Sequence, residues 1–368
     1  MKIDFFNTYI SPQAKELVGE VLDTTFLSEG KLTEQFEQEL QNTFGFKNII
    51  TLNSGTSALH LALDLLDIHE GDEVIIPAQT FIATGLAVLY CKGKVVFADI
   101  NYEDGNISIE SVKSKITPKT KAIICVHWGG YPCNLNGLKE ITKNTHIKII
   151  EDAAHALGSV YHNQIIGNIS DITCFSFQAI KHLTTGDGGA ITINNDTLYE
   201  KALRKKWFGI DRKNSAVTFL GERVYDLTEV GYKYHMNNFA ASLGLANLVG
   251  YNERLEKRIE IANYYKSELA NTKGITLFNE KEHYKSAYWL FGFHINQREE
   301  FINRMTEKNI PCSVVHQRID KYSIFGGVNN DLTNQTKFDE TQIHIPIHDS
   351  IDMDKAKYII NTIKEIVR

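Results

Sequence analysis

The chain has 368 residues, of which 43% are hydrophobic and 23% are charged, and its formal net charge is −6. This composition is typical of a globular protein, and the length allows one large domain with a sizeable core beside a smaller one. The acidic balance argues against nucleic acid as a partner, because nucleic-acid-binding proteins usually carry a basic surface. No apolar run approaches the roughly 20 residues of a membrane-spanning helix, so we expect no membrane partner.

Cysteine spacing and the first residues bear on the cellular compartment. The five cysteines are scattered and include no Cys-x-x-Cys pair, which argues against a disulfide framework and against a thiolate zinc site, and we expect no metal. The opening sequence MKIDFFNTYI contains Asp4 and lacks the apolar core of a signal peptide. We therefore expect a cytoplasmic protein.

Strands and helices are predicted to alternate from residue 48 onward. Short apolar runs predict strands at 48–54, 72–78, 94–100, 121–128 and 147–153. Apolar residues spaced three and four apart predict helices at 55–68, 81–91 and 134–144. This alternation implies crossover connections, and therefore an α/β fold with a mainly parallel sheet and helices on both of its faces.

The next part of the chain contains two further strands and a long helical stretch. Residues 172–177 and 189–194 predict strands, and the glycine-rich sequence TTGDGG lies between them. Residues 210–230 show no clear period and predict a loop. A helical pattern begins near Met236 and continues through 253–269.

The C-terminal part predicts a smaller α+β domain. Its expected elements are strands at 287–295 and 312–316 and helices at 299–309 and 354–367. We therefore expect a large domain over residues 1–245, including the N-terminal segment, and a small domain over residues 246–368.

Three features suggest a reactive site, although each has a simpler explanation. Asp152 ends an apolar strand, where open α/β sheets bind ligands, but a lone acid there is more often a cap or turn residue. Lys181 lies between a strand and the glycine-rich loop, which suits an amine that holds an aldehyde, but most single lysines lie on the surface. The sequence NSGTSALHLAL (53–63) runs from a strand into a helix start, which forms either a phosphate site or a plain helix cap.

Together these features fit pyridoxal phosphate (PLP). The cofactor needs a lysine for its aldehyde, an acid that keeps its pyridine nitrogen protonated, and an anion pocket for its phosphate. Each feature is weak alone, and their order and combination make the prediction specific.

The chain resembles the sugar aminotransferases of the DegT/DnrJ/EryC1/StrS family, which are fold-type I PLP enzymes with an aspartate aminotransferase-like fold. The resemblance extends over nearly the whole chain. It is carried by FLSEGKLTEQFEQEL (26–40), NSGTSALHLAL (53–63), PAQTFIATGLAV (77–88), EDAAHALGS (151–159), SFQAIKHLTTGDGG (176–189) and GYKYHMNNFAASLGLANL (231–248).

The resemblance implies roles for individual residues. Lys181 is similar to the lysine that holds the cofactor and moves the proton, and Asp152 to the partner of the pyridine nitrogen. His155 matches a position near the phenolic oxygen, and Phe81 matches the aromatic residue that stacks on the cofactor ring, although a core Phe is the simpler explanation. The implied ligands of the phosphate end are Gly55, Thr56, Ser57 and Ser176.

Several positions depart from the family pattern. Gln178 stands where many members have His, and Lys233 and His235 stand where many have Asn and Arg. The segment 231–238 of the family usually reaches the active site of the neighbouring subunit. The resemblance therefore implies a homodimer with composite sites, with His235 near the cofactor and with Lys233 and His316 as candidates for substrate binding.

The leading interpretation is an aminotransferase of amino-sugar biosynthesis. Its expected donor is glutamate, and its expected acceptor is a nucleotide-linked keto-sugar. One alternative is transamination of a non-nucleotide sugar acid such as an octulosonate, and another is a PLP-binding regulator without turnover, against which the retained Lys181 and Asp152 argue. A dinucleotide-binding oxidoreductase is not supported, because no G-x-G-x-x-G follows the first strand.

Overall fold

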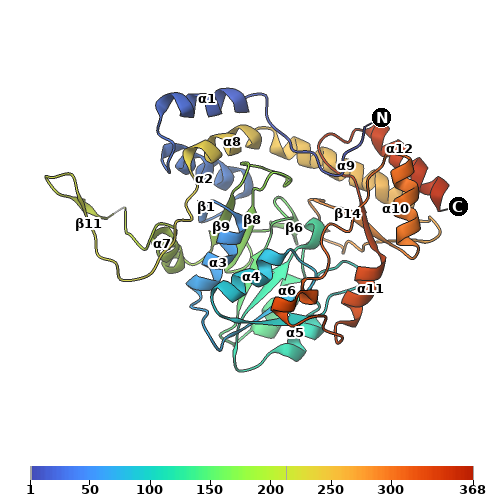
Figure 1. Ribbon diagram of the computed structural model, residues 1–368, viewed down its shortest axis with the longest axis horizontal. Helices are drawn as coiled ribbons and strands as arrows, with labels where there is room; N and C mark the ends of the chain where they lie inside the picture. The colour runs from blue at the N-terminus through green and yellow to red at the C-terminus, as the bar shows by residue number, and fades with distance from the viewer. Residues whose placement is uncertain (1, 213, 368) are drawn as a thin grey trace.

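The computed structural model describes residues 2–212 and 214–367, and its main element is a seven-stranded sheet (Figure 1). The strands, in the order of the sheet, are β1 (Ile49–Leu52), β9 (Gly189–Ile193), β8 (Ile172–Ser176), β5 (Lys148–Asp152), β4 (Thr120–Val126), β2 (Glu73–Pro77) and β3 (Lys94–Ala98). Only β9 runs antiparallel to its neighbours β1 and β8, and the other pairs are parallel. The mainly parallel sheet predicted from the alternating pattern is confirmed.

Helices cover both faces of this sheet, as the sequence predicted. One face packs on α2 (Lys31–Phe44), α5 (Ile109–Lys115), α6 (Leu135–Thr142) and α8 (Asn238–Leu248), and the other on α3 (Gly55–Leu65), α4 (Ile82–Tyr90) and α7 (Asp196–Lys205). Successive strand residues point to opposite faces, so Ile75 lies in one core and Val74 and Ile76 lie in the other. Because both faces are buried, the strands consist mainly of apolar residues.

The C-terminal part builds a third core around a small antiparallel sheet. Its strands and helices are β12 (Ile275–Leu277), β14 (Phe291–Ile295), β15 (Gln342–Ile345), α9 (Tyr251–Leu269), α10 (Arg298–Glu307) and α12 (Met353–Ile366). These elements agree with the predicted mixture of strands and helices. The expected boundary at residues 245 and 246 falls inside α8, and the division into two domains stays a prediction.

The remaining elements are short or peripheral. They are α1 (Ala14–Thr24), α11 (Thr333–Thr341), β6 (Val160–Tyr161), β7 (Gln164–Ile165), β13 (Tyr284–Lys285) and the 3₁₀ turns η1 (Trp128–Gly130), η2 (Ile319–Lys321) and η3 (Ser323–Phe325). Within the described ranges, no helix combines the length and apolarity that crossing a bilayer requires.

Two sequence predictions are wrong because the backbone leaves regular geometry. The expected strand 312–316 is not one, because Val315 has a φ of 62° and the His316 N–H donates to the Val314 carbonyl at 2.7 Å. The helical stretch expected from Met236 through 253–269 is interrupted by Gly250, whose φ is 66°.

Two further predictions need adjustment. The strand expected at 287–295 begins only at Phe291, after Tyr288 with its φ of 48°. The loop expected at 210–230 contains the hairpin of β10 (Ala216–Val217) and β11 (Arg223–Val224), which projects away from the rest of the chain (Figure 1).

Candidate active site

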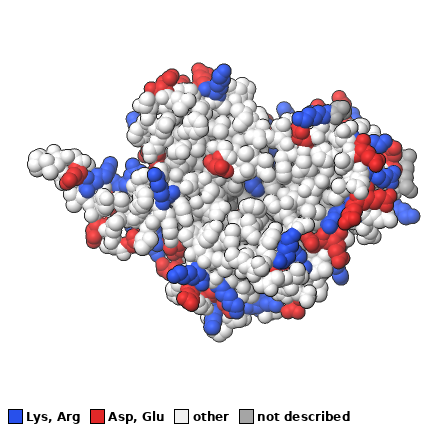
Figure 2. Space-filling view, viewed as in Figure 1, with Lys and Arg blue, Asp and Glu red and all other residues white. Residues whose placement is uncertain are grey.

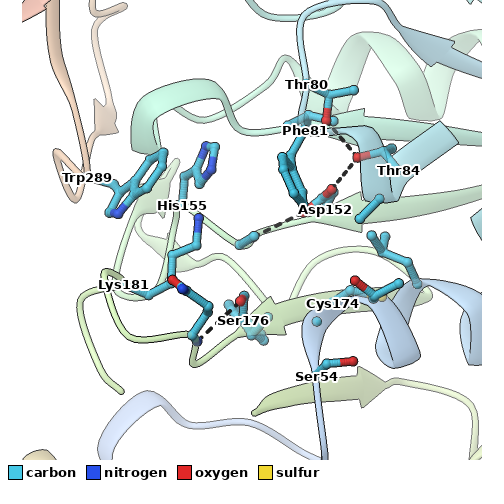
Figure 3. A pocket seen from close by; sticks show the side chains of 18 of the residues that line it. Ser54, Thr80, Phe81, Thr84, Asp152, His155, Cys174, Ser176, Lys181 and Trp289 are labelled. Carbon is cyan, nitrogen blue, oxygen red and sulfur yellow. Dashed lines mark hydrogen bonds between the residues drawn. The ribbon is translucent and has the colours of Figure 1, made fainter. Parts of the chain in front are cut away.

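A cavity of about 310 Å³ lies where strands β4, β5 and β8 end. Carboxyl ends of parallel strands are where open α/β sheets bind their ligands. The predicted site residues that line the cavity are Gly55, Thr56, Phe81, Asp152, His155, Ser176, Lys181 and His316. Figure 3 labels five of them, which converge from the start of α4, the ends of β5 and β8 and the loops that follow these strands: Phe81, Asp152, His155, Ser176 and Lys181.

Lys181 lies on the loop that connects β8 to β9. Burial lowers the pKa of its amine from 10.5 to about 7, and the nearby Asp152 carboxylate partly opposes this shift. Its Nζ lies 3.6 Å from the centre of the Trp289 ring. A substantial fraction of this amine is therefore neutral near pH 7, as a nucleophile for an aldehyde must be.

Asp152 is the last residue of β5 and is buried. Thr84 Oγ1 donates to its Oδ2 at 2.8 Å, and the Ala154 N–H donates to its Oδ1 at 3.2 Å. Burial raises the pKa of this carboxyl group, and the hydrogen bond from Thr84 acts in the opposite direction. A buried carboxylate is stabilised by a cation or an N–H donor, and the cavity leaves room for such a group from a ligand.

The start of α3 provides the expected anion site. Ser54 caps the helix, and its Oγ accepts from the Ser57 N–H at 3.0 Å. Ser57 Oγ donates to Asn53 Oδ1 at 2.6 Å and does not line the cavity, whereas Gly55 and Thr56 do. The free backbone groups at Gly55 and Thr56, together with the helix dipole, suit a phosphate.

Two aromatic side chains flank the remaining space. The buried His155 ring stacks on Trp289 with centroids 3.8 Å apart, and its Nδ1 has no hydrogen-bond partner among the described residues. Burial and the nearby Lys181 lower the pKa of His155 well below its usual value, so the ring is neutral. Phe81 is 51% exposed at the cavity, so it is not a core residue and its ring is free to stack on a flat ligand.

Lys233 and His235 do not line the cavity of their own chain. Their segment runs beside the end of β1, where the Asn53 N–H donates to the Tyr234 carbonyl at 2.7 Å and Leu52 bridges to His235. The His235 ring contacts Trp207 at a centroid distance of 4.1 Å. These two side chains therefore contribute nothing to the lining of this cavity.

The sequence analysis missed two residues of the site. Thr84 lies one turn after Thr80, and their hydroxyl oxygens are 2.6 Å apart, so a hydroxyl chain leads to Asp152. Trp289 lay inside a predicted strand, where nothing in the pattern distinguishes it from a core aromatic. The spacing of Thr80 and Thr84 by one helical turn could have indicated that their hydroxyl groups lie on the same side of the helix. No feature of the sequence around Trp289 indicates a role in the site.

The residues present fit PLP. The desolvated amine of Lys181 faces the space for an aldehyde, and the buried Asp152 carboxylate lies across the cavity from it (Figure 3). The unpartnered His155 Nδ1 and the helix start at Gly55 supply sites for a ring oxygen and a phosphate. The lysine, the carboxylate and the helix start are the three features that the cofactor requires, and His155 adds a partner for the ring oxygen.

Comparisons with known proteins agree with this geometry. The sequence pattern of the DegT/DnrJ/EryC1/StrS aminotransferase family matches residues 8–364. GDP-perosamine synthase of Escherichia coli O157:H7 is 32% identical over 367 residues, covering 99% of this chain and 98% of its own length. The UDP-4-amino-4,6-dideoxy-N-acetyl-beta-L-altrosamine transaminase of Campylobacter jejuni (serotype O:2) is 30% identical over 364 residues, covering 96% and 94%.

A solved structure gives the same result. Spr1654 from Streptococcus pneumoniae in its PLP form matches with a TM-score of 0.92 and 27% sequence identity, covering 100% of this chain and 99% of that one.

The lowered pKa of Lys181 predicts the pH dependence of PLP capture by the cofactor-free enzyme. Because the neutral amine is the nucleophile, the capture rate should rise as the pH passes through about 7 and then level off. Stopped-flow absorbance measures this rate. A rate that keeps rising to about pH 10 would show an ordinary lysine, and borohydride fixation of the cofactor on Lys206 or Lys233 would refute the assignment.

The second prediction concerns Asp152. An amide cannot hold a proton on a pyridine nitrogen, so Asp152→Asn should lower turnover by about 100-fold or more, or about 2.7 kcal/mol of transition-state stabilisation. Thr84→Val removes one hydrogen bond to the same carboxylate, and it should cost about tenfold. Turnover is measured by steady-state kinetics, with circular dichroism as the folding control. Near-normal turnover by a folded Asp152→Asn enzyme would overturn the role of this residue.

Proposed function

The chain belongs to the DegT/DnrJ/EryC1/StrS aminotransferase family, and on this premise we propose that it transfers an amino group from glutamate to a nucleotide-linked keto-sugar. That it is a PLP-dependent sugar aminotransferase follows from the family. The donor and the acceptor are the proposal. We also propose that the enzyme acts in the cytoplasm, as the sequence predicts.

The observation that carries the proposal is the placement of Lys181 opposite Asp152 in one desolvated cavity. When bound there, PLP supplies an electron sink for the bonds at the amino-bearing carbon. Lys181 holds the aldehyde and afterwards moves a proton, and its pKa near 7 suits both giving and taking that proton at neutral pH. Asp152 holds the proton of the pyridine nitrogen.

Two features of the cavity mouth support a sugar as the second substrate. Phe81 and His316 line the mouth with ring centroids 5.0 Å apart. Burial and the nearby Lys181 lower the pKa of His316 to about 4, so its ring is neutral and can exchange hydrogen bonds with hydroxyl groups. The left-handed Val315 before it is unusual for a β-branched residue, and such strain is often kept where it presents a functional side chain.

The names of two relatives support a nucleotide-linked acceptor. One matched enzyme is named for a GDP-linked sugar and the other for a UDP-linked sugar, and each is aligned over more than nine-tenths of this chain. We therefore expect a nucleoside diphosphate as the activating group. A sugar acid without a nucleotide remains the alternative acceptor.

The charge of the cavity leads to a proposal about assembly. Of the described residues that line it, Lys181 is the single lysine or arginine, and it is used by the cofactor. Arg212 does not line the cavity, and its Nη1 lies 2.8 Å from a carboxylate oxygen of Glu29. Among the described lining residues, no lysine or arginine is therefore left for a diphosphate. We propose a homodimer in which Lys233 and His235 of one chain approach the cavity of the other.

The projecting hairpin supports the same assembly. Residues 214–230 expose a group of large apolar side chains, namely Val217, Phe219, Leu220, Val224, Tyr225, Leu227 and Val230. Phe219 at the tip is 98% exposed. Figure 2 shows this arm reaching out with an uncharged tip, and apolar surfaces of this kind usually pack against a partner.

The substrate proposal predicts the outcome of a panel experiment. The enzyme is converted to its pyridoxamine form with glutamate, and nucleotide-linked 3-keto and 4-keto hexoses are offered beside free keto-sugar acids. We expect the PLP absorbance to return only with nucleotide-linked sugars. Recovery only with free sugar acids would favour the octulosonate-type alternative, and bound PLP that glutamate does not convert would contradict the proposed donor.

The dimer proposal predicts that Phe219→Ser combined with Leu220→Ser shifts the protein toward monomer, because the apolar tip loses its packing. Sedimentation velocity over a dilution series measures the shift, and activity should fall in parallel. Val328→Ser, which changes another half-exposed apolar residue away from the arm, is the control and should change neither. A wild-type monomer that is fully active at high dilution would contradict the composite site.

A further inference from the structure

The indole of Trp289 contacts three groups around the reactive lysine. Its Nε1–H donates to the carbonyl oxygen of Ile180 at 2.9 Å. Its ring lies 3.6 Å from Lys181 Nζ and stacks on the His155 ring at 3.8 Å with an angle of 16°. Figure 3 shows the indole side by side with the His155 ring, with the Lys181 amine pointing toward them. One buried side chain thus touches the amine, the backbone next to it and the histidine beside it.

The N-terminal segment supports this arrangement from outside. The Phe6 ring stacks on Trp289 with centroids 5.2 Å apart and an angle of 22°. Thr8 Oγ1 donates to the carbonyl oxygen of Ala179 at 2.9 Å. Both contacts join residues more than 150 positions apart in the chain, and both end on Trp289 or on the loop that carries Lys181.

This segment is itself anchored at both ends. His348 Nε2 donates to the Asp4 carbonyl at 3.0 Å, and the Ser11 N–H donates to the buried Asn247 Oδ1 at 2.8 Å. The Asn247 side chain in turn donates to the Thr184 carbonyl at 2.9 Å, farther along the lysine loop. Hydrogen bonds at Asp4 and Ser11 therefore fix the N-terminal segment, which contacts the loop that carries Lys181.

The backbone just before Trp289 is strained. Tyr288 has a φ of 48°, which is unfavourable for a bulky side chain and costs on the order of 1–3 kcal/mol. Its N–H donates to Ser286 Oγ at 3.0 Å, and its hydroxyl donates to Glu280 at 2.6 Å. These two hydrogen bonds stabilise the strained turn at Tyr288, and the turn determines where the indole of Trp289 lies.

We propose that Trp289 is a positioning residue for Lys181, and that Phe6 and Thr8 hold the indole and the lysine loop in place from outside. The ring face attracts the ammonium form of the amine, and its packing restricts the neutral form. A lysine side chain has four flexible bonds. Restricting the amine in both protonation states reduces the conformations that it samples and so favours reaction at the correct carbon. None of the three residues was predicted from the sequence.

The inference rests on the aminotransferase activity of the family and is independent of the proposed keto-sugar. It is therefore tested without sugar, on the PLP-loaded enzyme, by two measurements. The first is the midpoint of the pH titration of the cofactor absorbance before any substrate is added. The second is the donor half-reaction, with the amino acid that converts the wild-type enzyme fastest. Failure of the sugar panel would leave both measurements intact.

Trp289→Phe keeps a ring and removes the hydrogen bond to Ile180, and Trp289→Leu removes both. We expect the maximal rate of the half-reaction to fall by about tenfold in the first and by more in the second. The donor concentration at half-maximal rate should change by less than about twofold, and the titration midpoint should move by about half a pH unit or more. A merely structural role would lower the yield of folded enzyme and leave the midpoint unchanged.

Phe6→Leu decides the question if the Trp289 variants do not fold. By itself it should slow the half-reaction by about threefold in the wild-type background. Where Trp289→Leu folds, adding Phe6→Leu to it should have no further effect, because Phe6 acts through the indole. Thr8→Val should slow it similarly, whereas Thr24→Val, which removes a like hydroxyl-to-carbonyl bond at the end of α1, should not. Wild-type rate and midpoint in folded Trp289→Phe and Phe6→Leu enzymes, or full additivity of the double variant, would overturn the proposal.

Discussion

The burial of an amine and a carboxylate in one cavity is the constraint on which the rest of the structure depends. Removal from water disfavours the charged form of both groups, so it lowers the pKa of Lys181 and raises that of Asp152. The lowered value gives the amine its reactivity at neutral pH. The carboxylate is useful only if it stays charged, and the hydrogen bonds from Thr84 and the Ala154 N–H act in that direction.

The antiparallel strand β9 brings the parts of the site together. The chain reverses after β8, so the loop with Lys181 returns to the sheet at Gly189, opposite Ser176. A Cβ on Gly189 would lie 2.5 Å from the Ser54 carbonyl carbon, so glycine alone lets β9 approach the start of α3 this closely. The lysine loop and the phosphate end of the cavity are thereby held against each other by one close backbone contact.

The pattern of the sequence was sufficient for the sheet and for the centre of the site, because both depend on local signals. Apolar periodicity located the strands, and the sequence shows that Asp152 ends one strand and that Lys181 lies between another strand and a glycine-rich segment. The indole of Trp289 could not be assigned, because its role comes from partners far away in the sequence, such as Phe6 and His155. The strand expected at 312–316 was wrong for a related reason, since Val315 adopts a left-handed conformation that its β-branched side chain does not suggest.

These contacts distinguish the residues of the cavity from Lys233 and His235, the two residues proposed to act across a dimer. The residues that activate the cofactor lie in one chain and are tied together by the sheet, the loop and the N-terminal segment. Of the three positions that depart from the family pattern, Lys233 and His235 lie on a segment beside β1, outside that set of contacts, whereas Gln178 lies on the lysine loop and lines the cavity. We therefore expect changes of the Lys233 and His235 side chains to leave the contacts of Lys181, Asp152 and the indole intact. If the proposed dimer forms, substrate preference can vary through the neighbouring subunit while the geometry around the reactive amine stays constant.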